Sequence, residues 1–461
     1  MAEQEGYEAY MKERLAAQRS FFAEGKTREP GFRIEYLKKL GEAVDRYEQD
    51  ILDALRQDLG KSPEEAYLTE VSMVKEEIKL HVRMLRKWAR PRKVSTPSHL
   101  LPSKSYIVSE PFGVTLILSP WNYPFQLLLV PLIGAISAGN CAVLKPSQFT
   151  PAVNKVAEKI IAEVFPPEYV CLIDGDREQT MMLLGEPFDF IFFTGSPSFG
   201  KEVMLAASEH LTPVVLELGG KSPCIVDYRC DVNAAAKKIA WGKFLNAGQT
   251  CVAPDYLLVH SSLEQPLIEA LKRHITAFYG EDPSLSPYYP RIISQNALMR
   301  LKSYLGDGDI VYGGETKDDE RFMAPTIMRN VKPGSAVVED EIFGPILPVL
   351  TYDALSEAID YINARPKPLA LYFFGKSEKG MEVIGKTSSG GVCINDVVMH
   401  LANCNLPFGG VGNSGMGKYH GKYSFMVFSN ERALLKSPAK FDLPFRYAPF
   451  KYFSLIKKML S

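Results

Sequence analysis

Several features that would place a chain in a special class are missing from these 461 residues. The seven cysteines form no C-x-x-C pair, which argues against a structural zinc site, and their odd number argues against a disulfide framework. Residues 1–19 are rich in Glu, Lys and Arg and contain no apolar core, so they do not resemble a secretory signal. No run reaches the roughly 18–20 apolar residues that span a bilayer. We therefore expect a reduced, cytoplasmic location.

The sequence also lacks an excess of charge of either sign. Lys and Arg together number 53 against 54 for Asp and Glu, a net charge of −1, so nothing suggests a nucleic-acid binder. Hydrophobic residues make up 46% and charged residues 23%, which is ordinary for a globular enzyme. A chain of this length is long enough for two or three domains around a large core.

Helical patterns dominate the first ninety residues. Apolar side chains recur at helical spacing between charged ones, as from Ile34 to Leu55. The expected helices cover residues 5–24, 32–59 and 64–89. Prolines at 91, 97 and 102 then interrupt the pattern, and residues 104–109 alternate as a strand would.

From Val114 onward, short apolar runs alternate with helical segments. The expected strands cover residues 114–118, 141–144, 169–173, 189–193, 213–218, 256–259, 310–312, 324–327 and 390–394. The expected helices cover residues 125–138, 153–164, 263–279 and 293–304. This alternation predicts an α/β fold with a parallel sheet covered on both faces. Ligands bind such sheets beyond the carboxyl ends of the strands, where the polar segments 119–124, 145–148 and 194–200 fall.

Two reactive side chains stand beside flexible glycines. Glu217 opens the sequence E-L-G-G-K, and Cys251 closes the sequence G-Q-T-C 34 residues later. A thiolate is a nucleophile, and a carboxylate can activate the water that releases a covalent intermediate. Each residue alone also has an ordinary interpretation, because a single cysteine is usually a small buried hydrophobe and a single glutamate a surface charge. The pair of motifs favours the chemical interpretation.

The polar segments at the strand ends allow two interpretations each. In S-P-W-N-Y-P, residues 119–124, the amide of Asn122 could donate to an oxyanion or cap the following helix. In K-P-S-Q, Lys145 could contact the ribose or phosphate of a dinucleotide or lie on the surface. The segment F-T-G-S-P-S-F-G, residues 193–200, could offer a phosphate site at a helix start or form only a turn.

Together, these motifs resemble the aldehyde dehydrogenase superfamily from G-K-T-R at residues 25–28 to about residue 430. Further motifs in the same order are E-I-F-G-P at 341–345 and L-P-F-G-G-V-G-N-S-G-M-G at 406–417. The continuation Y-H-G-K-Y-S-F at 419–425 is similar to the class 3, or fatty-aldehyde, branch. The resemblance covers nearly the whole chain.

This resemblance implies a three-part architecture and a homodimer. A Rossmann-type parallel-sheet domain that binds NAD(P) would comprise residues 1–90 and 106–216, and an α/β catalytic domain would comprise residues 217–415. Residues 91–105 and 416–461 would form a small β oligomerisation arm, which pairs across the dimer, and a C-terminal tail.

The resemblance also implies which residues act. Cys251 would attack an aldehyde to form a thiohemiacetal, Asn122 and the backbone N–H of Cys251 would hold the oxyanion, and Glu217 would activate water to hydrolyse the resulting thioester. No metal is needed for this route, because N–H donors hold the oxyanion. The residues implied to contact the cofactor are Trp121, Lys145, Gln148, Thr194, Gly195, Ser196, Gly200, Leu218, Glu341 and Phe343.

One position departs from the family pattern and bears on cofactor choice. The family usually has a glutamate, which binds the adenosine ribose hydroxyls, where this chain has Gln148. A neutral amide can bind a hydroxyl or donate to a 2′-phosphate. We therefore expect both NAD and NADP to be used.

The expected activity is the oxidation of an aliphatic, medium- or long-chain, or aromatic aldehyde to its carboxylic acid. Two alternatives are an acylating enzyme that transfers the acyl group to coenzyme A and a non-enzymatic protein on the same fold. Glu217 argues against the first, since a thiol acceptor needs no water-activating base. The joint presence of Cys251, Glu217 and Asn122 argues against the second. His400 and His420 are expected to be structural.

The last residues combine aromatic, aliphatic and basic side chains. Residues 450–460 place apolar side chains at 453, 456 and 460 beside three lysines. This pattern fits a short helix that packs on the body of the enzyme, near the substrate entrance, or one that lies weakly on a membrane surface. Packing on the enzyme is the favoured alternative, and the segment is too short to span a bilayer.

Overall fold

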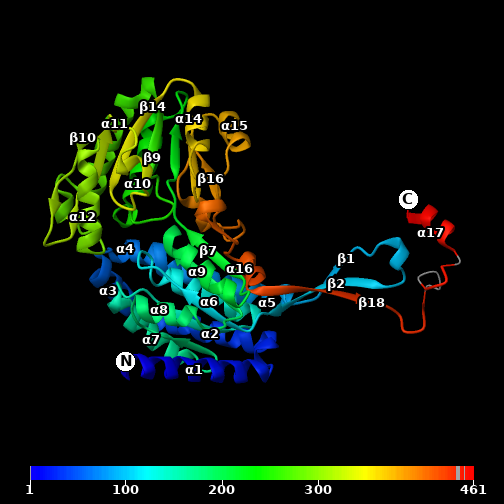
Figure 1. Ribbon diagram of the computed structural model, residues 1–461. Helices are drawn as coiled ribbons and strands as arrows, with labels where there is room; N and C mark the ends of the chain where they lie inside the picture. Colours follow the sequence, from blue (N-terminus) through cyan, green and yellow to red (C-terminus); the bar gives the residue numbers. More distant parts are fainter. Residues whose placement is uncertain (1, 443–446, 451, 461) are drawn as a thin grey trace.

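A computed structural model describes residues 2–442, 447–450 and 452–460 of the chain. It consists of a large body with two sheets and a long, thin arm that projects from it (Figure 1). No helix among these residues is both long enough and apolar enough to traverse a bilayer.

The first sheet has six strands in the order β17-β7-β6-β3-β4-β5. Five of them are parallel: β3 (Val114–Leu118), β4 (Cys141–Lys145), β5 (Val170–Leu172), β6 (Phe190–Gly195) and β7 (Val214–Leu218). The short β17 (Gly415–Met416) adds to the edge of β7 in the antiparallel sense. Nearly all strand residues are buried, as expected for a parallel sheet with helices on both faces.

Helices from the first half of the chain cover this sheet. They are α1 (Ala2–Ala23), α2 (Pro30–Arg46), α3 (Glu48–Leu59), α4 (Pro63–Ala66), α5 (Ser72–Trp88), α6 (Gln126–Ala138), α7 (Pro151–Val164), α8 (Arg177–Leu184) and α9 (Pro197–Glu209). Helix α6 is buried along its whole length, which explains why its sequence is apolar on every face. It packs against α5 and against α16 (Lys422–Val427).

The second sheet has seven strands in the order β10-β13-β14-β9-β8-β15-β16. These are β8 (Pro223–Val226), β9 (Tyr256–His260), β10 (Asp309–Tyr312), β13 (Thr326–Arg329), β14 (Ile346–Tyr352), β15 (Ala370–Phe374) and β16 (Gly391–Ile394). All pairs are parallel except that of β10 with β13. Its helices are α10 (Val232–Phe244), α11 (Glu264–Tyr279), α12 (Gln295–Ser303), α13 (Ala336–Glu339), α14 (Leu355–Asn363) and α15 (Ser377–Lys386), and a small hairpin joins β11 (Thr316–Lys317) to β12 (Phe322–Met323).

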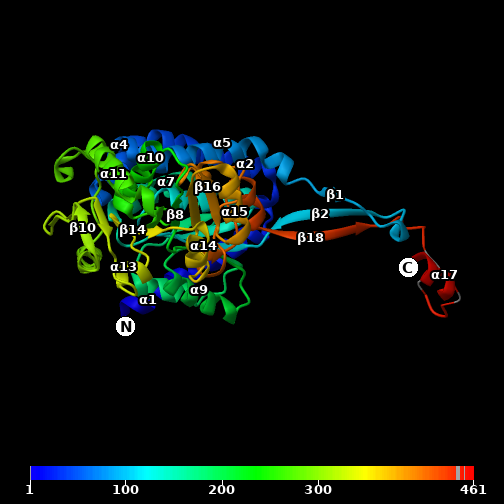
Figure 2. The same cartoon turned by 90° about the horizontal axis from the view of Figure 1, so that it is seen from above.

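The arm is a three-stranded antiparallel sheet in the order β1-β2-β18. Its strands are β1 (Arg92–Val94), β2 (Lys104–Pro111) and β18 (Ser429–Lys436). Helix α17 (Phe453–Leu460) lies at the far end of the arm, away from the body, in both views (Figures 1 and 2). The favoured prediction that the tail packs on the body is therefore wrong for the body of its own chain. Lys451 and the side chains of Ile456 and Leu460 lie outside what the structure describes.

The predicted α/β class and parallel sheets are confirmed, but two long helices are each divided. The pattern over 32–59 belongs to α2 and α3, which are separated at Tyr47, where φ is −94° and ψ is 11°. The pattern over 64–89 contains a π-helical turn, Tyr67–Val71, between α4 and α5. Side-chain periodicity does not register such breaks, because the apolar stripe continues across them.

The division into domains stays a prediction, and the strands depart from it in two places. Strand β2 continues to Pro111, beyond the arm boundary predicted at 105, because β18 pairs with it along its full length. Residues 415–427 join the body: β17 extends the first sheet and α16 packs against α6, although 416–461 had been predicted as arm and tail.

Candidate active site

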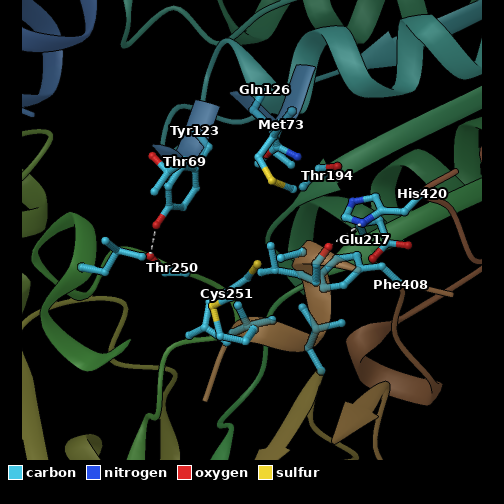
Figure 3. Close-up of a pocket in the computed structure, with 18 of the residues that line it drawn as sticks. Thr69, Met73, Tyr123, Gln126, Thr194, Glu217, Thr250, Cys251, Phe408 and His420 are labelled. Carbon is cyan, nitrogen blue, oxygen red and sulfur yellow. Dashed lines mark hydrogen bonds between the residues drawn. The ribbon is translucent and has the colours of Figure 1, made fainter. Parts of the chain in front are cut away.

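A cavity of about 340 Å³ brings Cys251 and Glu217 together between the two halves of the body. Both side chains face it in Figure 3, with Phe408 and His420 beside Glu217. Most of the remaining wall is apolar, and includes Met73, Leu127, Trp241, Leu245, Val252 and Leu401. The cavity therefore places a thiol and a carboxylate in an enclosed space that favours an apolar ligand.

Glu217 is fixed near the end of strand β7. Its backbone pairs with Thr194 of β6 on one side and with Gly415 of β17 on the other. The side chain is buried, and neither carboxylate oxygen has a hydrogen-bond partner within the described part of the chain. Burial raises the pKa of Glu217 well above its ordinary value, and the positive charge of Lys418 partly opposes this rise. An unpartnered carboxylate of raised pKa suits a general base.

Lys418 approaches Glu217 through the glycine-rich loop. A Cβ added to Gly409 would lie 2.7 Å from Oε1 of Glu217 and 3.0 Å from Cδ of Lys418, so the three residues are in close contact. The Lys418 ammonium donates to the carbonyls of Gly409 and Gly410. Burial lowers the pKa of Lys418, and the charge of Glu217 partly restores it. Lys418 is thus the cation that faces the carboxylate.

Cys251 follows a strained turn that ends helix α10. Asn246 and Ala247 adopt left-handed conformations, with φ of 51° and 50°, which costs energy for residues other than glycine. Burial raises the pKa of the Cys251 thiol to about 12, and the negative charges of Glu341 and Glu217 add to the rise. In this state the thiol is protonated at neutral pH, so a base or a change in the surrounding charge has to accompany its attack.

Asn122 lies behind the cavity wall rather than on it. Its Nδ2 donates to the carbonyl of Gln249, two residues before Cys251, at 3.0 Å. Helix α6 begins at Gln126 after the N-cap residue Phe125, and its first N–H groups donate to the carboxylate of Glu70 rather than to Asn122, so the alternative that Asn122 caps this helix is wrong. Because Nδ2 carries two hydrogens, one N–H remains beyond the bond to Gln249. The structure therefore joins Asn122 to the nucleophile loop but does not place it among the residues that line the cavity.

A second cleft, of about 420 Å³, lies beyond the carboxyl ends of β3, β4 and β6. Six of the predicted cofactor residues line it: Trp121, Lys145, Gln148, Thr194, Gly195 and Ser196. Two buried hydroxyls on its wall, Ser119 Oγ and Thr194 Oγ1, have no hydrogen-bond partner within the described residues. Helix α9, capped by Ser196, points its first N–H groups toward the same edge. Free donors, free hydroxyls and a helix start fit a dinucleotide.

Lys145 and Gln148 both line this cleft, but Lys145 is buried and Gln148 is exposed. The buried Lys145 ammonium donates to the carbonyl of Gly175 at 2.6 Å and to that of Pro146 at 3.0 Å. Burial lowers its pKa. One of its three donors remains for a ligand. Gln148 is exposed at the cleft mouth. Lys145 therefore stabilises the loop through two hydrogen bonds and keeps one donor for a ligand. The Gln148 amide is available to bind a ligand.

Gly200 and Leu218 do not line this cleft, and they pack against each other. A Cβ added to Gly200 would lie 2.6 Å from Cδ2 of Leu218, so the glycine lets α9 approach β7 closely. Leu218 lines the cavity that holds Cys251. Gly200 is not among the residues that line the cleft, and its predicted direct contact with a cofactor remains a prediction.

Glu341 and Phe343 lie on the loop that follows α13 and line neither the cavity nor the cleft. The Glu341 carboxylate accepts a hydrogen bond from the backbone N–H of Gly220 and lies against Gly219. Burial raises its pKa to about 8. The Phe343 ring meets Trp121 edge-on, with centroids 5.4 Å apart, and its φ is 46°. Arg300 holds the loop by donating to the carbonyl of Ile342 at 2.8 Å.

The two histidines predicted to be structural belong to an aromatic cluster. The His420 ring stacks on Phe408 with centroids 5.0 Å apart, and its Nδ1 lies 3.2 Å from the carbonyl of Leu401. His420 also lines the cavity. The His400 ring also packs against Phe408, with centroids 6.1 Å apart, and burial lowers the pKa of His400 to about 4. Both rings are therefore neutral at pH 7, which fits packing better than proton transfer from the ring.

Sequence reasoning missed three charged residues at this site. Lys418 stands inside the recognised block 406–425, but nothing in its neighbours indicates that it faces Glu217. Lys61 and Glu70 belong to the N-terminal helical region and form an ion pair with no exposed surface beneath the Asn122 loop. Charged residues in a helical pattern are normally assigned to its solvated face, so periodicity gives no signal for a buried pair. Within the described residues, no group of three or more His, Cys, Asp or Glu side chains could hold a metal ion.

Comparison with known proteins agrees with this geometry. Residues 2–434 match the aldehyde dehydrogenase family. The chain is 49% identical over 436 residues to the 4,4'-diaponeurosporen-aldehyde dehydrogenase of Staphylococcus aureus, covering 94% of this chain and 95% of that protein. It is 45% identical over 418 residues to a rat protein named aldehyde dehydrogenase, dimeric NADP-preferring, covering 90% of this chain and 92% of the relative.

A solved structure gives the same result. The substrate-bound state of Staphylococcus aureus AldH superposes with a TM-score of 0.96 at 47% identity, covering 98% of this chain and 99% of that one. With the family match over nearly its whole length, the chain belongs to the aldehyde dehydrogenase family and is an oxidoreductase that oxidises aldehydes with NAD or NADP.

Proposed function

We propose that the preferred substrates are apolar aldehydes, either aliphatic with a medium or long chain or aromatic. The observation that carries this proposal is the wall of the cavity around Cys251, where apolar side chains outnumber polar ones. Removing apolar surface from water contributes about 0.8 kcal/mol for each buried CH₂ group. A longer alkyl chain should therefore bind this cavity more tightly than a short one.

We assign the chemistry to the three residues that the sequence predicts. Once the Cys251 thiol has lost its proton to solvent, Sγ attacks the carbonyl carbon and forms a thiohemiacetal anion, whose oxyanion accepts hydrogen bonds from Asn122 and from the backbone N–H of Cys251. The bound cofactor supplies the acceptor for the hydride that leaves this carbon. Glu217 then takes a proton from water as the water oxygen bonds to the carbonyl carbon. The C–S bond breaks to release the acid, and the proton held by Glu217 passes to the departing Cys251 sulfur, which restores both the thiol and the carboxylate. The raised pKa of Glu217 and its unpartnered oxygens support this role.

The residue set also supports the use of both cofactors. Exposed Gln148 stands at the cleft mouth, where a carboxylate would repel a 2′-phosphate. The rat relative is named NADP-preferring. We propose that Glu341 binds the nicotinamide ribose and that Trp121 and Phe343 pack beside it, since Trp121 lines the cleft and the Phe343 ring packs edge-on against it.

One assay panel tests the substrate and the reaction type. NAD(P)H absorbance is followed with short, long and aromatic aldehydes, each with and without coenzyme A. We expect kcat/KM to rise with chain length and to be unchanged by coenzyme A. A preference for short polar aldehydes would overturn the substrate proposal, and a dependence on coenzyme A would favour the acylating alternative.

We further propose that the chain forms a homodimer through its arm. The outer edge of β18 carries unpaired backbone groups, and residues 430–436 are exposed, including Leu434 and Leu435. An exposed edge strand pairs readily with another chain. Sedimentation velocity should give the mass of two chains, and replacing Leu435 by lysine should shift the protein toward one. A single-chain mass for the wild type would exclude the arm as a dimer contact.

The tail has two candidate contacts, the partner's body and a membrane surface. We propose the first, because an arm that pairs with a partner carries α17 toward the partner. The exposed aromatic side chains Phe450, Tyr452 and Phe453 would be shielded from solvent there. Liposome co-sedimentation of the full chain and of a chain that ends at residue 440 distinguishes the two contacts: equal partitioning supports the partner, and loss of partitioning on truncation supports the membrane. The cytoplasmic location remains a prediction.

A further inference from the structure

Lys61 and Glu70 form an ion pair that is completely inaccessible to solvent. Their side chains have 0% exposure, and Lys61 Nζ lies 2.6 Å from Glu70 Oε1. Neither residue lines the cavity or the cofactor cleft. Taking two charges out of water is costly, and apolar residues of similar size often stabilise a fold as well as such a pair does. The contacts that the pair makes indicate what else it does.

Within the described residues, every side-chain hydrogen bond that links the pair to the rest of the chain ends on residues 122–126. Glu70 Oε2 accepts from the N–H of Phe125 at 2.9 Å and from that of Gln126 at 3.2 Å, and so caps helix α6. Lys61 Nζ donates to the carbonyl of Asn122 at 3.0 Å. The same ammonium lies 4.0 Å from the centroid of the Tyr123 ring. The pair therefore fixes the backbone of the loop at residues 122–126, which carries the Asn122 amide.

Glu70 itself lies in the π-helical turn Tyr67–Val71, which interrupts the long helical pattern between α4 and α5. A π-helical turn is less stable than α-helix and often accompanies a functional site. Here the turn contains the carboxylate that caps α6.

The Asn122 loop is also hydrogen-bonded to the nucleophile loop, residues 246–250, which precedes Cys251. Asn122 Nδ2 donates to the carbonyl of Gln249, and Asn246 Nδ2 donates back to the carbonyl of Asn122 at 2.8 Å. The Tyr123 hydroxyl lies 2.6 Å from Thr250 Oγ1 (Figure 3). Because the Asn122 carbonyl accepts from both Lys61 and Asn246, the buried pair and the strained turn before Cys251 hold the same peptide group.

We infer that the Lys61–Glu70 pair is a positioning device for the oxyanion site. It fixes the peptide of Asn122 so that the free N–H of the Asn122 amide points to the place where the thiohemiacetal oxygen forms. The pair touches neither substrate nor cofactor, and it acts through Asn122. This inference rests on the proposed role of Asn122 in holding the oxyanion.

The test is a cycle of variants in which charge and position are separated. Lys61→Met with Glu70→Gln removes both charges together, keeps an acceptor for the N–H groups of Phe125 and Gln126, and deletes the bond to the Asn122 carbonyl. The measurement is the single-turnover rate of NAD(P)H formation, which reports acylation, together with the aldehyde KM and the thermal midpoint. The control is Arg33→Met, which deletes a buried cation that also donates to backbone carbonyls but lies far from this loop.

We expect the paired variant to slow NAD(P)H formation on the order of tenfold to a hundredfold, since a misplacement of about 1 Å can cost about 10²-fold. The aldehyde KM should change little. Arg33→Met should lower the thermal midpoint without slowing acylation. In an Asn122→Ala background, which is already slow, the paired change should cost less than about twofold more, because residues that act as one unit are not additive.

Two results would overturn the inference alone: unchanged acylation in the paired variant, or the same fold-loss with and without Asn122. If Asn122→Ala itself acylates at the wild-type rate, the oxyanion role of Asn122 is wrong and the inference falls with it. Should the paired variant not fold, Glu70→Gln alone enters the same cycle, and additivity with Asn122→Ala is again the contradicting result.

Discussion

Replacing Gly219 by alanine should damage cofactor use while leaving the fold nearly intact. The φ of Gly219 lies outside the left-handed region, so its backbone can accept a side chain. The added Cβ, however, would lie 2.5 Å from Oε1 and 2.6 Å from Cδ of Glu341, and nearer still to Oε2. Ordinary contact needs roughly 3.5 Å. The carboxylate must therefore retreat by roughly 1 Å.

This displacement should reduce the rate of cofactor use more than it reduces the free energy of unfolding. The displaced atoms are the end of a flexible side chain, so the main cost to folding is the hydrogen bond from the Gly220 N–H to the Glu341 carboxylate. Because burial raises the pKa of Glu341 to about 8, the group is mostly protonated at pH 7, and a hydrogen bond between neutral groups contributes about 0.5–1.5 kcal/mol. A shift of about 1 Å in a group that positions the reactants costs about 10²-fold in rate, or about 2.7 kcal/mol of transition-state stabilisation. We expect kcat/KM for NAD and NADP to fall by that order.

The assay is steady-state kinetics with varied cofactor, together with cofactor titration by quenching of the protein's tryptophan fluorescence and a thermal melt. Gly385→Ala is the matched control, because its Cβ meets nothing within 4 Å and its helix should gain about 1 kcal/mol. Unaltered cofactor kinetics in Gly219→Ala would refute the reasoning. So would an equal loss in a Glu341→Ala background, where the clash no longer exists.

Four further predictions concern the catalytic residues and cofactor choice. Cys251→Ser should nearly abolish dehydrogenase activity while fold and cofactor binding persist; substantial residual turnover would exclude Cys251 as the nucleophile. Glu217→Gln should leave a pre-steady-state burst of NAD(P)H followed by a much slower phase, and a lost burst would mean that Glu217 also serves acylation. Lys418→Met removes the cation that opposes the raised pKa of Glu217, so the acid limb of the pH profile for hydrolysis should move to higher pH; a coincident profile argues against contact between the two charges. Wild-type specificity constants for NAD and NADP should differ by less than about two orders of magnitude, and Gln148→Glu should raise the KM for NADP, because like charges brought together cost a few kcal/mol. No measurable NADP activity in the wild type, or an unchanged KM in the variant, would mean that position 148 does not face the adenosine ribose.

The first parallel sheet was the easier part of the fold to predict. Its strands are continuous apolar runs such as Val114–Leu118, because burial on both faces removes the need for polar residues. The polar segments after β3, β4 and β6 then fall together at one edge, and the structure places them around one cleft. The parallel order follows from the alternation of strand and helix, which is visible in the sequence.

The second sheet and the deeper parts of the site were harder to predict. In the second sheet, strands β8, β14 and β15 and helices α10, α13, α14 and α15 were not predicted from the sequence, even though Asp231 caps the start of α10. The spacing of residues along the sequence also does not show which way a buried charged side chain points. Lys61 and Glu70 look like any other charged positions of a helical region, and only the path of the chain brings them beneath Asn122. The placement of α17 far from its own body likewise depends on the arm, whose length is set by the pairing of β2 with β18.

That pairing has a consequence for how the chain is made. Strand β18 joins β2 across more than three hundred residues of sequence, and β17 covers the edge of β7 only after residue 415 has been synthesised. At translation rates of about 5–20 residues per second, the edge of β2 that later pairs with β18 stays open for roughly 15–60 seconds after it leaves the ribosome, although β1 can already cover part of the other edge. An exposed strand edge is a template for aggregation during that time. Chains released before their last fifty residues should therefore accumulate as clients of chaperones and proteases, whereas completed chains close both edges as soon as their ends are free.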